Sequence, residues 1–158
     1  EEKYETNEKP LGPVTKTGES KLDIELKRNI FPVEVGTDLG KILGVSIIYF
    51  DLDKWNIRPD AAEDLEKIIA VMNQYPNMTI DIRSHTDSRQ THKYNELLSD
   101  RRAKSTLEFM VKNGINRNRL TAKGYGETQL VNNCSDDVPC SEAEHQKNRR
   151  SEFIVLKM

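Results

Sequence analysis

Residues 78–103, MTIDIRSHTDSRQTHKYNELLSDRRA, decide the fold because they predict a strand, a polar loop and a helix in direct succession. Met78, Ile80 and Ile82 alternate with polar residues, which is the pattern of a strand with one buried face. The polar stretch HTDSRQTHK that follows interrupts every hydrophobic period and predicts a loop. A strand that runs into a polar loop and then a helix is typical of the layered α/β folds.

The helix after this loop is predicted from about Tyr94 to Asn113, because apolar residues recur along one of its sides. Gly114 would end it, since glycine readily adopts the left-handed conformation found after helices. Working outward, the same patterns predict a strand at 47–50, a helix at 59–75, a strand at 119–126, a short polar helix at 141–149 and a last strand at 151–158. The last strand is apolar on both faces, so we expect it in the centre of the sheet.

This order of elements predicts an α/β (α+β) sandwich of the β-α-β-α-β type, with helices packed on one mixed sheet. Residues 38–158 would form that domain. Residues 1–37 are predicted to be a linker or extension. Residues 1–20 are polar and show no period, which is typical of disorder, whereas residues 21–35 alternate and suggest one or two short edge strands.

The bulk composition excludes several classes of partner. The chain has 158 residues, a net charge of -2 and 32% charged residues, which gives no electrostatic attraction to nucleic acid or to an anionic membrane. Its longest apolar stretch, residues 42–50, is far shorter than the ~20 residues that span a bilayer. No glycine-rich phosphate loop is present, and no cofactor is predicted. The start at Glu1 leaves a removed targeting segment open.

The two cysteines, Cys134 and Cys140, stand in the turn-prone stretch NNCSDDVPCSE. Their short spacing favours a local disulfide that closes a surface loop, and this would imply an oxidising compartment. The alternative is two free thiols in a cytosolic loop. A metal site would need more ligands nearby than His145 supplies, so no metal site is predicted.

Asp51 and Asp53 directly follow the apolar run at 47–50, which is how some magnesium-dependent phosphotransfer enzymes present a nucleophile and its acid partner. Lys54 and Trp55 come next, where such a motif needs small residues so that phosphate can approach. The later acidic pair lies inside the cysteine loop rather than after a strand. A phosphohydrolase is therefore kept only as an alternative, and the domain is predicted not to be an enzyme.

The loop after the strand at 78–84 carries Asp87, and the helix behind it carries Arg102. Asn95, Leu98 and Arg102 lie along one edge of that helix, beside its apolar stripe, so Arg102 should be partly buried. An acid and an arginine directed at one place suit a zwitterionic amino-acid centre, because the acid binds the ammonium group and the guanidinium binds the carboxylate through two parallel N–H bonds. A plain salt bridge between Asp87 and Arg102 explains the same spacing, and the sequence leaves both explanations open.

A set of short motifs is spread over residues 45–158: His85-Thr86-Asp87, Asn95, Leu98-Ser99, Arg102-Ala103, Gly124-Tyr125-Gly126-Glu127 and Asn148-Arg149-Arg150. In combination they resemble the OmpA-like C-terminal domain, the peptidoglycan-binding module of Gram-negative envelope proteins. The cysteine loop ahead of HQKNRR is similar to versions found in envelope proteins of Bacteroidetes. The resemblance covers most of the chain, and it implies both a fold and a ligand.

The implied ligand is the meso-diaminopimelate of the peptidoglycan stem peptide, whose side chain ends in a free amino-acid centre. By this resemblance Asp87 would bind the ammonium group of that centre and Arg102 its carboxylate group. The other residues implied at the site are Thr86, Asn95, Leu98, Asp51, Asp53 and Arg149, with Arg149 favoured over Arg150.

The implied function is non-catalytic binding of peptidoglycan, which would anchor the outer membrane to the cell wall from the periplasmic side of a Gram-negative cell. Membrane association would run only through a region that precedes residue 1, and self-association into a homo-oligomer is left open. A second alternative is a module that docks a partner's peptide, in which an Asp87–Arg102 bridge is only structural.

Overall fold

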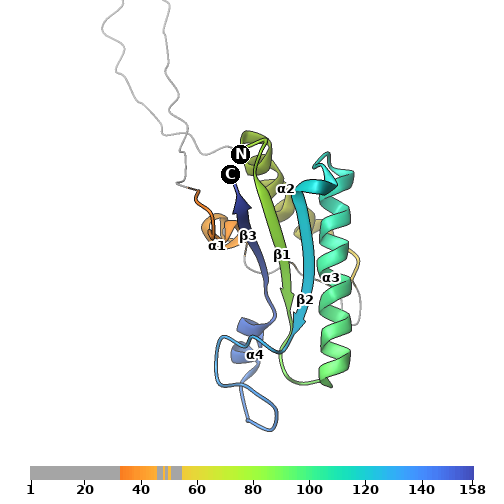
Figure 1. Cartoon of the computed structure of the whole chain (residues 1–158). Coiled ribbons are helices and arrows are strands. Elements are labelled where there is room, and N and C mark those ends of the chain that lie inside the picture. Colours follow the sequence, from red (N-terminus) through yellow and green to blue (C-terminus); the bar gives the residue numbers. More distant parts are fainter. Residues whose placement is uncertain (1–32, 46–47, 49, 51–54) are drawn as a thin grey trace, which may run out of the picture. The chain divides into compact units, whose positions relative to one another are not determined.

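The computed structural model of the chain describes residues 33–45, 48, 50 and 55–158 (Figure 1). The sheet of this part of the chain has three strands: β1 (Thr79–His85), β2 (Leu120–Gly126) and β3 (Ser151–Lys157). β1 lies in the middle, parallel to β2 and antiparallel to β3, so the sheet is mixed, as predicted. The ends of β1 and β2 and the start of β3 therefore meet at the same end of the sheet, and we call this the site end.

Helices pack on one face of this sheet. Along β1 the residues Ile80 and Ile82 are buried while their neighbours are only half-buried, so a single face joins the apolar core. The helices are α1 (Leu39–Leu43), α2 (Pro59–Gln74), α3 (His92–Lys112) and α4 (Glu142–Asn148), with a single 3-10 turn, η1 (Arg117–Arg119), before β2. α3 runs along β2 and also contacts β1, and α1 contacts β3 (Figure 1). The predicted α/β sandwich is confirmed.

The helices begin where local residues can satisfy or replace the first hydrogen bonds. α3 begins after Thr91, whose hydroxyl accepts a hydrogen bond from the main-chain N–H of Tyr94 at 3.3 Å. α4 begins with a capping box, in which Ser141 and Glu144 bind each other's main-chain N–H groups. α2 begins with Pro59 in its first position and has no side-chain cap, so its pre-set proline φ angle is what favours the start.

The position predicted for the last strand needs correction, and most of the strands expected ahead of α2 lie outside the described residues. Within the described sheet the central strand is β1 rather than β3, and alternate residues of β3 are half-buried or exposed, with Leu156 45% accessible. Residues 33–37 form a turn where an edge strand was expected to end, and this turn pairs with β3 through hydrogen bonds from Gly36 N to Val155 O and from Val155 N to Thr37 O. The rest of the expected strands at 21–35 and 47–50 lies outside the described residues, apart from Ile48 and Phe50.

The loop between β2 and α4 is closed by a disulfide between Cys134 and Cys140, so this prediction is confirmed. The loop is attached to the chain that follows β1, because the buried hydroxyl of Ser88 donates to the carbonyl of Cys134 at 2.7 Å. None of the helices in the described part of the chain combines the length and the apolar composition needed to cross a bilayer.

Candidate ligand-binding site

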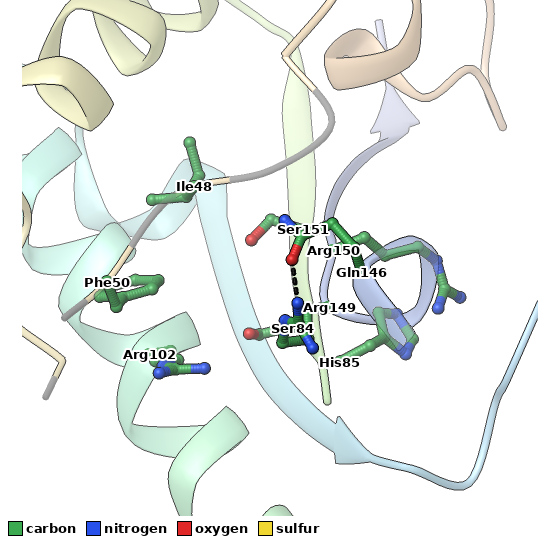
Figure 2. Close-up of a pocket in the computed structure, with 9 residues that line it drawn as sticks. All are labelled: Ile48, Phe50, Ser84, His85, Arg102, Gln146, Arg149, Arg150 and Ser151. Carbon is green, nitrogen blue, oxygen red and sulfur yellow. Dashed lines mark hydrogen bonds between the residues drawn. The ribbon is translucent and has the colours of Figure 1, made fainter. Parts of the chain in front are cut away.

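A pocket of about 190 Å³ opens at the site end of the sheet. Its lining residues come from α3, from the end of β1, from α4 with the start of β3, and from the segment ahead of α2: Ile48, Phe50, Ser84, His85, Arg102, Gln146, Arg149, Arg150 and Ser151. Figure 2 shows Arg102 and Phe50 on one side of the pocket, facing Arg149, Arg150 and Gln146 on the other. Three arginines and no acidic residue appear among these lining residues, which suits an anionic group.

Arg102 is half-buried, as the sequence predicted, and it is held in place by an aromatic ring. Its guanidinium carbon lies 5.0 Å from the centre of the Phe50 ring, within the range of a cation–π contact. Such stacking restricts the planar group to few orientations. Arg102 is therefore placed to bind a carboxylate that enters the pocket.

Asp87 is buried in the loop after β1 and is bound by two arginines. Its Oδ2 accepts hydrogen bonds from Arg149 Nη1 at 2.5 Å and from Arg89 Nη2 at 2.8 Å. Glu142 on α4 is the second acid of this cluster and also accepts from both arginines. Asp87 and Arg102 are thus not paired as the plain salt bridge would require. Instead, Arg149 links Asp87 to the pocket that Arg102 lines.

Asp87 remains ionised over the whole physiological range. Burial on its own raises the pKa of this carboxyl group, but the hydrogen bonds from Arg89 and Arg149 outweigh it and lower the pKa to about 2. Its Oδ1 atom accepts only the main-chain N–H of Arg89, at 3.2 Å, among the described residues. Because a carboxylate oxygen has two lone pairs, Oδ1 keeps capacity for one more donor.

Thr86, Asn95 and Leu98 do not line the pocket but lie around the loop that carries Asp87. The amide nitrogen of Asn95 donates to the carbonyl of Asp87 at 3.0 Å and also binds Glu127, so it fixes the loop to α3 and to the end of β2. Thr86 is buried, and its main-chain N–H donates to the carbonyl of Gly126 at 2.9 Å. Leu98 is half-buried on α3. Asp51 and Asp53, the other predicted site residues, lie outside the described residues.

Sequence reasoning missed some of the residues that shape this site. Arg89 is the main one, because it follows Asp87 by two residues and folds back onto its carboxylate, an arrangement that a turn-rich loop makes available. Gln146 and Ser84 line the pocket without any sequence signal that distinguishes them. Among the described lining residues His85 is the only His, Cys, Asp or Glu, so these residues do not supply a ligand set for a metal ion.

His85 is buried and its ring stacks on Tyr125, with ring centres 5.4 Å apart. Burial, assisted by the charge of Arg150, lowers the pKa of His85 to about 4 from an ordinary value of 6.5. The imidazole is therefore neutral at pH 7. Among the described lining residues the positive charge therefore comes from the three arginines.

Acidification should destabilise the domain through His85. Between pH 6.5 and about 4 the unfolded chain binds a proton at this residue and the folded chain does not, so stability falls as the pH falls across that window and levels off below it. The full loss is about 3 kcal/mol. Urea unfolding measured across this range should show a smaller pH dependence for His85→Gln than for the wild type. Equal pH dependence in the two proteins would contradict the assignment.

Comparison with known proteins agrees with this arrangement of elements. Residues 49–144 match the sequence profile of the OmpA family. The chain belongs to the OmpA family. A relative named peptidoglycan-associated lipoprotein, from Agrobacterium fabrum, is 36% identical over 108 residues, which cover 68% of this chain and 58% of that protein. A relative named outer membrane porin F, from Pseudomonas fluorescens, is 37% identical over 108 residues, which cover 68% of this chain and 32% of that protein.

Among solved structures, the peptidoglycan-associated lipoprotein of Burkholderia pseudomallei aligns with a TM-score of 0.59 and 24% identity. The alignment covers 68% of this chain and 87% of that one. This likeness shows that the fold is shared. The region matched by this OmpA-family chain is 58% of the length of the first curated relative and 32% of the length of the second. The family assignment confirms the prediction that this domain is not an enzyme, and the phosphohydrolase alternative built on Asp51 and Asp53 falls with it.

Proposed function

We propose that this OmpA-family domain binds peptidoglycan by holding the free amino-acid centre of meso-diaminopimelate between Asp87 and Arg102. The observation that carries the proposal is the pocket at the site end, which Arg102 lines and which Arg149 links to the buried, ionised Asp87. The family assignment supports it, as do the relatives named for association with peptidoglycan. In this proposal residues 38–158 form the binding domain and residues 1–37 an extension leading into it.

The ammonium group of the ligand would bind Asp87. It can join at Oδ1, which accepts a single main-chain hydrogen bond in the described chain, or it can replace Arg149 at Oδ2. Arg149 tolerates such a replacement because Glu142 and Gln146 also bind it. A charge-assisted hydrogen bond of this kind contributes about 1.5–3 kcal/mol when it is sheltered from water.

The carboxylate group of the ligand would bind Arg102. The guanidinium has the fork geometry that matches a carboxylate, and the nearby charges of Arg149 and Arg150 raise the local potential for an anion. In this assignment Thr86, Asn95 and Leu98 act by shaping the loop and the helix edge around the ligand. Asp51 and Asp53 are proposed as further wall residues.

The cellular role that follows is a non-covalent link between the cell envelope and the wall. The names of the relatives associate those proteins with peptidoglycan and with the outer membrane, and the disulfide between Cys134 and Cys140 fits an oxidising compartment. We infer a periplasmic site of action at the outer membrane. Many copies on one sacculus would hold the envelope jointly even if each bond were weak and reversible.

Titration with two peptides tests the proposal, one containing meso-diaminopimelate and one containing lysine at the same place, each joined through its α-amino and α-carboxyl groups as in a stem peptide. Both side chains then end in an ammonium group, but that of lysine has no carboxylate there and should leave Arg102 without its ligand partner. We expect the lysine peptide to bind more weakly by about 10- to 150-fold, which corresponds to the loss of one charged hydrogen-bonded contact. Isothermal titration calorimetry would measure both affinities, and equal affinities would refute the assignment of Arg102.

A further inference from the structure

A second cluster of charged groups contains none of the residues that line the pocket, and none of its members takes part in the proposed function. His92 is the first residue of α3, Glu127 follows the end of β2, and Asp136 lies in the disulfide loop. One ligand atom from each of the three residues lies within 4.8 Å of the other two. The imidazole Nδ1 of His92 is 2.9 Å from a carboxylate oxygen of Glu127, and its Nε2 is 3.8 Å from a carboxylate oxygen of Asp136.

The burial of Glu127 separates this cluster from an ordinary group of surface charges. Its side chain is only 3% exposed, although a carboxylate is rarely buried without a compensating partner. The amide nitrogen of Asn95 binds Oε2, and among the described residues Oε1 has His92 as its partner. Oε1 therefore faces the imidazole of His92, whose side chain is 73% exposed.

We propose that His92, Glu127 and Asp136 form a binding site for a divalent transition-metal cation of the Zn²⁺ class. One imidazole nitrogen with two carboxylate oxygens is a ligand set for borderline cations, whereas Ca²⁺ and Mg²⁺ prefer oxygen ligands alone. Three protein ligands leave coordination positions for water on the exposed side. Asn95 supplies the supporting hydrogen bond that orients a ligating carboxylate in known metal sites.

The charges around the cluster favour a cation. Two carboxylates carry two negative charges, and the neutral imidazole adds none. The N-terminus of α3 opposes a cation at His92, but the helix dipole amounts to only about half a positive charge there. The other candidate set in the described chain, Cys134, Cys140 and Glu144, is unavailable because its two sulfur atoms form the disulfide.

A cation at this place would join three segments that are far apart in the sequence. It would fasten the disulfide loop to the start of α3 and to the exit of β2 through Asp136, His92 and Glu127. The same region already holds the Asp87 loop, because Ser88 binds Cys134 and Asn95 binds the carbonyl of Asp87. The cation would thus brace the segments around the Asp87 loop. The proposal does not depend on what ligand Asp87 binds.

Zn²⁺ binding to the whole chain tests this inference. Chelator-treated protein, in buffer without thiol reductant so that the cysteines stay paired, would be titrated with Zn²⁺ by calorimetry. We expect one saturable site and a rise in Tm, because an ion that binds only the folded state stabilises it. Asp136→Asn and His92→Gln should each weaken binding at least about tenfold, the smallest loss usual even for a supporting residue of a metal site. The Asp136 side chain is exposed, so Asp136→Asn should not disturb folding, and the glutamine amide of His92→Gln can still donate a hydrogen bond to the buried Glu127.

The matched control is Asp137→Asn, which changes the neighbouring acid of the same loop and should leave Zn²⁺ affinity unchanged. NMR of the histidine side chains adds a second readout. Zn²⁺ should change the chemical shifts of the ring nitrogens of His92, whereas those of the buried His85 and His145 should not change. Three results would overturn the proposal: no saturable Zn²⁺ binding, equal weakening by Asp136→Asn and Asp137→Asn, or a response to Ca²⁺ as strong as that to Zn²⁺. Loss of binding to meso-diaminopimelate would bear on the pocket and not on this cluster.

Discussion

Asp87→Asn should abolish co-sedimentation of the domain with peptidoglycan sacculi while the domain stays folded. The amide keeps the shape of the side chain but removes the charge that would bind the ligand's ammonium group. Loss of one partner of a sheltered charge pair costs about 2–5 kcal/mol, which lowers affinity by at least about 30-fold. The variant also loses the favourable pairing that holds the pKa of Asp87 near 2, which should reduce stability at pH 7 by about 2 kcal/mol.

The control for Asp87→Asn is Glu142→Gln, because Glu142 binds the same two arginines but is exposed. Its removal should leave both sacculus binding and unfolding close to those of the wild type. Arg102→Ala should lose sacculus binding as Asp87→Asn does, because it removes the guanidinium group proposed to bind the ligand's carboxylate. If Asp87→Asn unfolds, Arg102→Ala still decides the matter, and a folded Arg102→Ala variant that sediments with sacculi would contradict the proposed site.

Gly124→Ala should destabilise the domain severely, because α3 and β2 approach each other at this glycine. A Cβ atom there would lie 2.1 Å from the main-chain nitrogen of Asp100 and 2.4 Å from the hydroxyl of Ser99. Main-chain atoms cannot move aside as a flexible side chain can, so α3 would have to shift away from the sheet. We expect a loss of about 3 kcal/mol or more in the free energy of unfolding, measured with urea. Ser99 adds to the cost, because its hydroxyl accepts the N–H of Gly126 at 2.8 Å.

Lys123→Ala is the comparison for Gly124→Ala, since Lys123 lies next to it on the exposed face of β2 and should change stability by no more than about 0.5 kcal/mol. If Gly124→Ala changed the free energy of unfolding by less than about 1 kcal/mol, α3 and β2 would not pack as closely as described. A displaced α3 would also carry Arg102 away from the pocket. Ligand binding should therefore weaken together with stability.

Local patterns predicted the elements well, and pairings between distant segments less well. β1, α3, β2 and β3 lie within a few residues of their predicted ranges, because periodicity and end signals such as Gly114 act within the element itself. The place of β3 in the sheet was not predictable in this way. Its apolar residues indicate burial, but which strand takes the centre depends on neighbours contributed by other parts of the chain.

The same limit applies to the site. The positions of Asp87 in the loop after β1 and of Arg102 on α3 followed from spacing, and the structure has both where the sequence placed them. The partners of Asp87 did not follow. Arg149 reaches it from 62 residues away, and Arg89 reaches it only because the loop turns back on itself. Neither contact produces a periodic pattern in the sequence. The sequence alone therefore could not show whether the Asp87 carboxylate binds Arg89 and Arg149 or binds Arg102.

The turn at residues 33–37 meets β3 at Val155, toward the end of that strand remote from Ser151 and the pocket. A tension applied between a wall-bound ligand and the chain ahead of Val33 would therefore act roughly along the strands. If the domain binds the wall as proposed, such a pull would first load the two hydrogen bonds between this turn and Val155. The attachment of the turn to β3 would then limit the force that the module carries before the β1–β3 ladder is strained.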